Sequence, residues 1–407
     1  MPLHVVFVAP FFMDTTLRFV RAVATTPDVH CSLLTQEAPF KVPDDLRKLL
    51  AGFCQVDDAM DARHIERGVR LIQSKHGKVD RLFGALEHIQ VQLADVRATL
   101  GLGGLTPMAA RNFRDKAQMK DVLQRAGLPC AGFREVKSSS DAWQFAGTVG
   151  YPLVIKPREG AGSKGTFRVD GDKELADALL AVRPAELRPA IIEEFVTGDE
   201  YSFEVLSLAG KPLWHSLTRY LPNPLDAVRN PWIQWCVLLP REVDDPRYDD
   251  VRAAGFAALT ALGMDTGMSH MEWFRRPDGR LAISEIAARP PGAQIVTLNG
   301  LACDFDLYRA WALLMCHGKF TPPQRKYAAG AAFFRGQGQG RIKAIHGLEQ
   351  VQRELGHVVV ELKLPHIGIR PSSSYEGDGY ALLRHPETRV VEQALRRIVE
   401  LVYVELG

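Results

Sequence analysis

Residues 270–292 read HMEWFRRPDGRLAISEIAARPPG, and this stretch decides the fold. Two segments that alternate apolar and polar residues flank a Pro-Asp-Gly sequence, and Asp-Gly between such segments is a strong hairpin signal. If Asp278 and Gly279 are the two loop residues, Glu272 lies directly opposite Glu285. The Cβ atoms of cross-strand neighbours are roughly 4.5 to 5.5 Å apart, and like charges there destabilise a sheet unless something neutralises them. The pairing therefore favours a bound divalent cation that prefers oxygen ligands.

An exposed hairpin held by ion pairs is the alternative interpretation of this stretch. Arg275, Arg276 and Arg280 lie near the predicted turn and could neutralise the two glutamates. Exposed ion pairs are common on protein surfaces. This alternative stays open at the level of the hairpin alone.

The length and charge of the chain limit the classes of protein that it can be. A chain of 407 residues is too long for one ordinary core, so two or three domains are expected. Charged residues make up 24% and hydrophobic residues 46%, as in soluble globular proteins. Lys plus Arg number 50 against 48 for Asp plus Glu, so neither nucleic acid nor an anionic membrane is indicated as a partner.

The cysteines and the first residues predict a cytoplasmic protein. The six cysteines include no CxxC pair, which indicates reduced thiols and makes a zinc site improbable. The opening segment MPLHVVFVAPFF has no basic region, and Asp14 interrupts its apolar run, so we expect a strand and not a signal peptide. No segment has the apolar length of a membrane span.

The first hundred residues alternate between short apolar runs and helical patterns, which predicts a small parallel sheet. No GxGxxG loop follows the first strand, so a dinucleotide site is improbable. Glu87 follows a predicted strand end, where it could bind a ligand or simply begin a helix. Strands are expected at 5–9, 29–34, 52–56 and 79–84, with helices at 15–24 and 62–76.

A glycine-rich break at 101–107 marks the first predicted domain boundary. Asp115 after it is a good N-cap for a helix that ends near Gly127. Lys116 occupies the first turn of this helix, where the helix dipole disfavours a cation. This position would be explained by a bound anion.

Residues 151–169 predict a strand, a glycine-rich loop and a second strand, an arrangement that can cover phosphates. Glycines allow consecutive backbone N–H groups to converge on phosphate oxygens, and nearby lysine and serine side chains add charge and donors. The spacing does not match a Walker A motif. An ordinary flexible turn is the alternative. The residues concerned are Lys156, Gly160, Gly162, Ser163, Lys164 and Gly165.

Carboxylates also recur in the next predicted strands. Glu193 and Glu194 interrupt the apolar run AIIEEF at 190–195, and Glu200 begins a strand with alternating faces. From about residue 321 the chain is expected to form a small β-rich segment closed by a helix.

Five motifs occur in a set order: DKAQMK, VIKPREGAGSKG, IIEEFVTGDEYS, HMEWF and EIAARPPG. Together they resemble the ATP-grasp superfamily, particularly the carboxylate–amine ligases that include L-amino acid ligases and relatives of D-alanine–D-alanine ligase. The resemblance implies an α/β protein with the ATP-grasp fold. It implies a Rossmann-like pre-ATP-grasp domain at 1–105, the nucleotide clamp at 106–320 with a small lobe at about 130–195, and a C-terminal extension at 321–407.

The resemblance also implies roles for individual residues. Lys116 and Lys156 would contact the ATP phosphates, and the glycine loop at 160–165 would close over them. Glu193 would accept from the adenine amino group beside Glu194, Val196 would offer backbone contacts to the base, and Glu200 would bind the ribose. Glu272 and Glu285 match a pair that binds one or two Mg²⁺ ions. Arg289 matches the arginine that stabilises the transferred phosphoryl group and the acyl phosphate.

The activity that the resemblance implies is ATP-dependent ligation. Such enzymes activate a carboxylate as an acyl phosphate and then join it to an amine, forming an amide and releasing ADP and phosphate. Two anions meet in the first step, so cations between them are the central requirement. The expected partners are small-molecule carboxylate and amine substrates, and a homodimer is compatible with the resemblance.

One position departs from the family pattern. An asparagine usually follows the second glutamate by two residues as a further metal ligand, and here that residue is Ala287. The predicted hairpin places His270 opposite Ala287, so water or His270 could take the place of the missing ligand. A structural or substrate-facing histidine is the favoured alternative.

Other functions and the substrate stay open. A biotin-carboxylase-like enzyme shares the clamp, although its phosphate loop usually has more glycines, and Ala287 would suit an ATP-binding regulator without turnover. Acceptor-pocket candidates lie in or after the strand predicted at 213–220, although core packing explains them equally well. They are His215, Arg219, Tyr220, Trp232 and Trp235.

Overall fold

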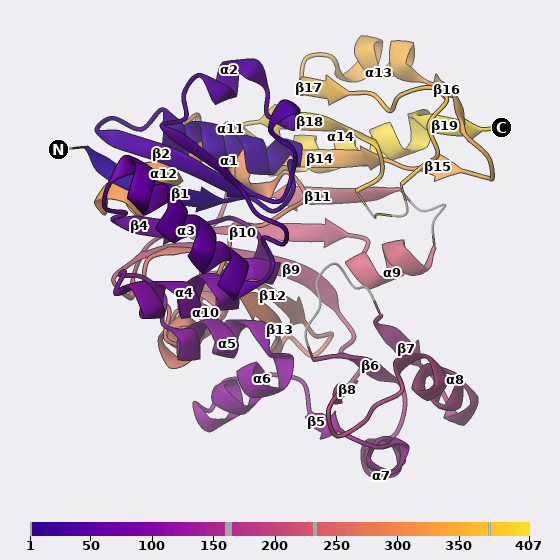
Figure 1. The fold of residues 1–407 in the computed structure, drawn as a ribbon. Coiled ribbons are helices and arrows are strands. Elements are labelled where there is room, and N and C mark those ends of the chain that lie inside the picture. The colour runs from indigo at the N-terminus through magenta and orange to yellow at the C-terminus, as the bar shows by residue number, and fades with distance from the viewer. Residues whose placement is uncertain (1, 159–164, 231–233, 373, 375) are drawn as a thin grey trace.

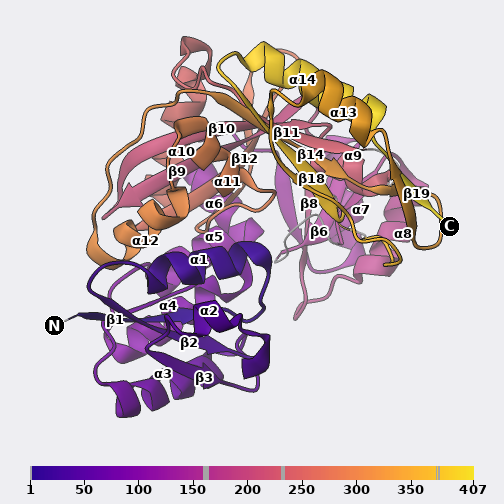
Figure 2. The ribbon, with the colours of Figure 1, turned by 90° about the horizontal axis from the view of Figure 1, so that it is seen from above.

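The computed structural model describes residues 2–158, 165–230, 234–372, 374 and 376–407 (Figure 1). It shows the mixed α/β arrangement that was predicted, built from four sheets. Figures 1 and 2 place the beginning and the end of the chain on opposite sides of the molecule. Among the described residues, every helix is too short or too polar to cross a membrane.

The N-terminal part is a parallel sheet covered by helices, because its apolar runs alternate with amphipathic helical segments. The strand order is β3-β2-β1-β4, and every pair is parallel. Its elements are β1 (Leu3–Val8), α1 (Asp14–Ala24), β2 (Val29–Thr35), η1 (Pro39–Lys41), α2 (Asp44–Arg47), β3 (Gly52–Gln55), α3 (Ala62–His76), β4 (Arg81–Phe83), η2 (Glu87–Ile89) and α4 (Gln90–Leu100).

Two helices lead from this part to a small lobe. They are α5 (Pro107–Arg114) and α6 (Lys116–Arg125), and Asp115 caps α6 as predicted, its Oδ1 accepting from the N–H groups of Ala117 and Gln118. The small lobe is an antiparallel sheet in the order β5-β8-β6-β7. It contains β5 (Phe133–Val136), α7 (Ser139–Val149), β6 (Leu153–Pro157), β7 (Phe167–Val169), α8 (Asp172–Val182) and β8 (Ala190–Glu194).

An eight-stranded antiparallel sheet forms the centre of the molecule, in the order β13-β12-β9-β10-β11-β14-β18-β17. The five strands of this sheet that come first along the chain are β9 (Asp199–Leu208), β10 (Lys211–Leu221), β11 (Trp235–Leu239), β12 (Gly267–Arg275) and β13 (Leu281–Ala287). The helical elements between and after them are α9 (Pro224–Arg229), η3 (Pro246–Tyr248), α10 (Asp249–Leu262), α11 (Ile295–Cys303) and α12 (Leu307–His317). In Figure 1 the small lobe projects from this sheet on the side away from the N-terminal part.

The segment after residue 321 is largely an extension of the central sheet. β14 (Ala328–Phe334), β17 (Val359–Lys363) and β18 (Gly379–His385) complete the eight strands, and β14 pairs directly with β11. A separate three-stranded sheet contains β15 (Gly336–Gln337), β16 (Ile342–His346) and β19 (Tyr403–Leu406). Helices α13 (Leu348–Leu355) and α14 (Thr388–Leu401) complete the segment. The predicted boundaries at 105 and 320 stay predictions.

The hairpin of β12 and β13 pairs Glu272 with Glu285 and His270 with Ala287, as predicted. The predicted two-residue turn is wrong, however. Gly279, at φ 83°, donates its N–H to the carbonyl of Arg276 (2.9 Å), so the loop has three residues. This shifts the register by one residue, and a bulge at Ser284 shifts it back. The three-residue loop and the bulge shift the register in opposite directions, so Glu272 and Glu285 still face each other.

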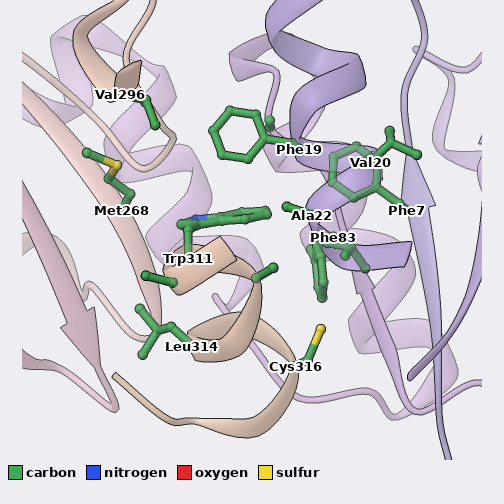
Figure 3. Close-up of a cluster of buried hydrophobic side chains, with 14 of the residues drawn as sticks. Phe7, Phe19, Val20, Ala22, Phe83, Met268, Val296, Trp311, Leu314 and Cys316 are labelled. Carbon is green, nitrogen blue, oxygen red and sulfur yellow. The ribbon is translucent and has the colours of Figure 1, made fainter. Parts of the chain in front are cut away.

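Alternate residues of the central strands enter different cores. Phe203 and Val205 of β9 pack with α10, whereas Leu206 belongs to a core shared with the N-terminal part. Figure 3 shows Trp311 of α12 at the centre of this shared core. Its ring centroid lies 4.8 Å from that of Phe19 and 5.6 Å from that of Phe83. The N-terminal part is therefore joined to the central sheet by aromatic packing.

Candidate active site

A cavity of about 340 Å³ lies where the N-terminal part, the small lobe and the central sheet meet. Most residues that the motifs singled out face it. From the small lobe and α6 it receives Lys116, Lys156, Glu193, Glu194 and Val196, and from the central sheet and the following loop it receives Glu200, His270, Glu272, Glu285, Ala287 and Arg289. The tertiary structure thus brings together five motifs that are up to about 170 residues apart.

Two buried lysines that line this cavity pair with carboxylates. The Nζ of Lys116 lies 2.7 Å from Oε1 of Glu285, and its side chain is only 7% exposed. The Nζ of Lys156 lies 3.0 Å from Oε1 of Glu193. Burial lowers the pKa of Lys156, but the carboxylates of Glu193 and Glu285 outweigh this effect and raise it. Both positions are consistent with the anion partner that the placement of Lys116 suggested.

Lys120 is a site residue that sequence reasoning missed. It is completely buried, and its Nζ lies 3.3 Å from Oε2 of Glu193. Burial raises the pKa of Glu193, and the ammonium groups of Lys120 and Lys156 lower it below its ordinary value. Lys120 follows Lys116 by four residues on one helix, so it lies on the same face. That spacing was the signal that could have revealed it.

The Glu272–Glu285 pair has the donor set that Mg²⁺ uses. Burial raises the pKa of Glu285, but Lys116 and Lys156 outweigh it and lower this pKa to about 2, so the carboxylate is ionised. Across the described ranges, no three His, Cys, Asp or Glu residues form a group that could hold a metal ion. Mg²⁺ typically combines one or two protein carboxylates with substrate phosphates, so a two-glutamate site fits it.

The arginines of the hairpin do not neutralise this pair, which rules against the exposed ion-paired alternative. Arg275 pairs with Asp250, Arg276 with Glu194, and Arg280 with Asp278. All three lie toward the turn and away from the glutamate pair.

Glu200 adds a further carboxylate beside the pair. Its burial, followed by the nearby charges of Glu272 and Asp226, raises its pKa well above the ordinary value. The residue is 7% exposed, and its backbone N–H donates to Oδ1 of Asn223 (3.2 Å). A ligand that brings hydroxyl donors would compensate this buried carboxylate.

His270 faces the cavity from β12 beside Ala287, but its ring is engaged on both sides. Nδ1 lies 2.9 Å from Oε1 of Glu204, and Nε2 lies 3.7 Å from Oε1 of Glu272. Burial lowers the pKa of His270, and hydrogen bonding to the two carboxylates more than compensates and raises it. Because each ring nitrogen lies next to a carboxylate oxygen, the arrangement argues against His270 as a metal ligand.

Arg289, in the loop after β13, contacts the N-terminal part. Its Nη2 and Nε lie 2.9 and 3.1 Å from Oε2 of Glu87, and Oε1 of Glu87 accepts from Nη1 of Arg114 (2.9 Å). Glu87 begins η2, the helical turn that follows β4. Its carboxylate therefore belongs to the site and links the N-terminal part to the loop after β13.

The glycine loop is only partly described. Gly160, Gly162, Ser163 and Lys164 lie outside the described residues, as does Trp232. Gly165 has φ 70°, in the left-handed region that glycine adopts readily, and the following Thr166 lines the cavity.

Two of the acceptor-pocket candidates do not line the cavity. His215 packs against Phe203 and Phe256 on the opposite face of the central sheet, with ring centroids 5.6 and 6.1 Å away. Arg219 also lies on that face and pairs with Asp199 (3.2 Å). Tyr220, one residue further along β10, does line the cavity, as does Trp235. Alternation along β10 explains the difference.

Comparison with known proteins gives a consistent assignment. A family model described as the ATP-grasp domain matches residues 121–304. The chain is 25% identical over 245 residues to an L-arginine-specific L-amino acid ligase of Bacillus subtilis. The matched region covers 59% of this chain and 58% of that protein. The chain spans about two thirds or less of the length of the curated relatives that it matches.

Solved structures resemble the whole chain. An L-amino acid ligase from Bacillus licheniformis superposes with a TM-score of 0.80 at 20% identity, covering 100% of this chain and 99% of that one. An N5-carboxyaminoimidazole synthetase from Staphylococcus aureus complexed with ADP superposes with a TM-score of 0.72 at 16% identity, covering 98% of both chains. The chain therefore has the ATP-grasp fold, and its residues 121–304 match the model of the ATP-grasp domain.

Proposed function

We propose that this protein is an ATP-dependent ligase that activates a carboxylate as an acyl phosphate and joins it to an amine. The observation that carries the proposal is the convergence of Lys116, Lys156 and Arg289 with the Glu272–Glu285 pair in one cavity. Cations that line the same cavity as paired carboxylates suit a reaction in which two anions must approach each other.

The proposed reaction has two steps. An oxygen of the substrate carboxylate attacks the γ-phosphorus of ATP, the bond from that phosphorus to the bridging oxygen breaks, and ADP leaves. The amine nitrogen then attacks the carbonyl carbon of the acyl phosphate. The bond from that carbon to the phosphate oxygen breaks, phosphate leaves with the electron pair, and the nitrogen loses its surplus proton. The products are an amide, ADP and phosphate.

Each group of residues has one proposed task. Lys116 and Lys156 bind the ATP phosphates, and residues 160–165 cover them. Arg289 lies against the transferred phosphoryl group, where its charge offsets the developing negative charge. The residues proposed to bind the nucleoside are Glu193, Glu194 and Val196 for the base and Glu200 for the ribose.

Glu272 and Glu285 are the residues that would hold Mg²⁺. When bound, Mg²⁺ neutralises phosphate charge during phosphoryl transfer. Lys116 pairs with Glu285 (2.7 Å) and is also one of the two lysines proposed to bind the ATP phosphates.

Oxygen transfer from substrate to phosphate tests the acyl-phosphate step. Amino acids and small carboxylates labelled with ¹⁸O in the carboxylate are screened in pairs with amines for ATP-dependent phosphate release. Mass spectrometry then measures the label in the phosphate and the mass of the product. We expect one ¹⁸O atom in each phosphate that is released and an amide of the summed substrate masses less one water.

Glu285→Gln is the matched control, because it keeps the side-chain volume and removes the charge that would hold Mg²⁺. We expect it to lower turnover by at least about 100-fold, the scale of losing a principal electrostatic group. Unlabelled phosphate with normal turnover would overturn the acyl-phosphate mechanism. Undiminished activity of Glu285→Gln would overturn the metal assignment.

A further inference from the structure

Glu204 is a completely buried carboxylate in the middle of the central sheet, outside the cavity itself. Its oxygens accept from Ser202 Oγ (2.5 Å) and from Thr218 Oγ1 (3.2 Å). Its one ion-pair partner among the described residues is His270, whose Nδ1 lies 2.9 Å from Oε1. An isolated buried charge is costly, so a group at this depth is kept only with such partners.

The His270 ring lies between the buried Glu204 carboxylate and the cavity. Its Nδ1 side is fixed by Glu204, and its Nε2 side lies 3.5 Å from the hydroxyl of Tyr220 and 3.7 Å from Oε1 of Glu272. His270, Tyr220 and Glu272 all line the cavity. Glu204 therefore fixes the orientation of the ring through Nδ1, and the ring places Nε2 near Glu272.

The two metal-site glutamates differ in what holds them. Glu285 is bound by Lys116 at 2.7 Å. For the Glu272 carboxylate, His270 is the only side chain within ion-pairing distance in the part of the chain that the structure describes. The position of Glu272 thus depends on the ring that Glu204 fixes.

We propose that Glu204 and His270 are a positioning pair that orients the Glu272 carboxylate for the metal–nucleotide complex. This inference rests on the proposed function, because it assigns the metal to Glu272 and Glu285. Residues that orient metal ligands typically change metal affinity by about 10- to 100-fold when they are replaced. His270 is then a positioning residue and not itself a ligand.

Two substitutions of His270 separate the two ends of the ring. In His270→Asn, the amide nitrogen takes the place of Nδ1, so the contact with Glu204 is kept and the contact with Glu272 is lost. In His270→Gln, the amide nitrogen takes the place of Nε2, so the contact with Glu272 is kept and Glu204 loses its partner. The measurements are the affinity for Mn²⁺ in the presence of ADP, by electron paramagnetic resonance, and the thermal unfolding midpoint.

The positioning role predicts opposite orders for the two measurements. His270→Asn should unfold near the wild-type temperature but bind Mn²⁺ about 10- to 100-fold more weakly. His270→Gln should unfold at a lower temperature but bind Mn²⁺ closer to wild type. If His270 were merely structural, His270→Asn would have both the higher unfolding midpoint and the higher Mn²⁺ affinity of the two variants. That result would overturn the inference.

Failure of the proposed function gives a different result. If the wild-type protein binds ADP without any dependence on Mn²⁺, the metal assignment fails and the inference fails with it. If the wild-type protein binds Mn²⁺ with ADP and both variants match it, the proposed function stands and the positioning role of His270 is overturned.

Discussion

Charge pairing at Glu285 makes the stability of the protein depend on pH in a specific window. Lys116 and Lys156 lower the pKa of this partly buried carboxylate to about 2, against an ordinary value of 4.5. A group whose pKa is lowered by folding stabilises the folded state above the unfolded pKa, and this stability is lost as the pH falls through the folded pKa. Between pH 4.5 and 2 the contribution therefore disappears.

Lys116→Met should reveal this contribution. At pH 7 we expect the free energy of unfolding to fall by roughly 3 kcal/mol, as for the loss of one partner of a buried pair. The difference from wild type should shrink as the pH falls towards about 2, because Glu285 without Lys116 takes up its proton at a higher pH than wild-type Glu285 does. Urea unfolding at a series of pH values measures it, and a difference that is constant with pH would contradict the assignment.

Glu200 should show the opposite sign. Burial and then the charges of Glu272 and Asp226 raise its pKa, so its ionisation destabilises the folded state as the pH rises through this pKa. Glu200→Gln should increase the free energy of unfolding at pH 8 by on the order of 1 kcal/mol, since one pKa unit corresponds to ~1.4 kcal/mol. It should also weaken ATP binding. Urea unfolding at pH 5 and 8 with ATP titration calorimetry tests both, and a loss of stability at pH 8 would refute this account.

At the scale of elements, the connection between β8 and β9 is pinned against β12. Gly198 has φ 142°, and a Cβ atom there would lie 2.2 Å from the carbonyl oxygen of Arg275. The connection carries Val196 on one side and leads to Glu200 on the other. A displacement of this connection would therefore move residues from both sides of the proposed nucleoside site.

Gly198→Ala should consequently impair folding and ATP binding together. We expect a loss of more than about 1 kcal/mol, which is the scale for replacing a glycine whose conformation alanine cannot adopt, and a raised KM for ATP. Gly279→Ala is the matched control, because Gly279 has φ 83° but open space around its Cβ position. Thermal unfolding and ATP kinetics compare the two. Equal effects would show that backbone strain alone, and not the clash with β12, sets the cost.

At the scale of the whole molecule, the cavity depends on the docking of the N-terminal part. Trp311 is 2% exposed and packs edge-on against Phe7, Phe19 and Phe83 of that part (Figure 3). The same part supplies Glu87, which holds Arg289. Loosening the aromatic core should therefore also disturb the proposed phosphoryl-transfer site.

Trp311→Ala should lower the free energy of unfolding by about 3 to 5 kcal/mol, as is usual for removing a buried tryptophan. Trp143→Ala is the control, because Trp143 is 39% exposed, and we expect a change within about 0.5 kcal/mol. Urea unfolding and limited proteolysis of the junction near residue 105 measure the effect. Similar stabilities of the two variants would argue against a docking role for this core.

Local patterns were sufficient to predict much of the fold. Hydrophobic periodicity placed α3 at 62–76, and the capping residue Asp115 placed the start of α6, because both signals act within a few residues. The resemblance carried by five short motifs gave the ATP-grasp fold. The pairing of Glu272 with Glu285 was also predicted, although the loop is one residue longer than predicted and an unpredicted bulge restores the register.

The sequence by itself therefore determined much of the secondary structure, the order of the motifs and the residue types of the candidate site. Only the tertiary structure decided which buried charges meet: Lys120 with Glu193, Glu87 with Arg289, and Glu204 with His270. It also decided that His215 faces away from the cavity and that β14, β17 and β18 complete the central sheet. The physical reason is that these contacts join residues far apart in the chain, where no local propensity or periodicity specifies the partner.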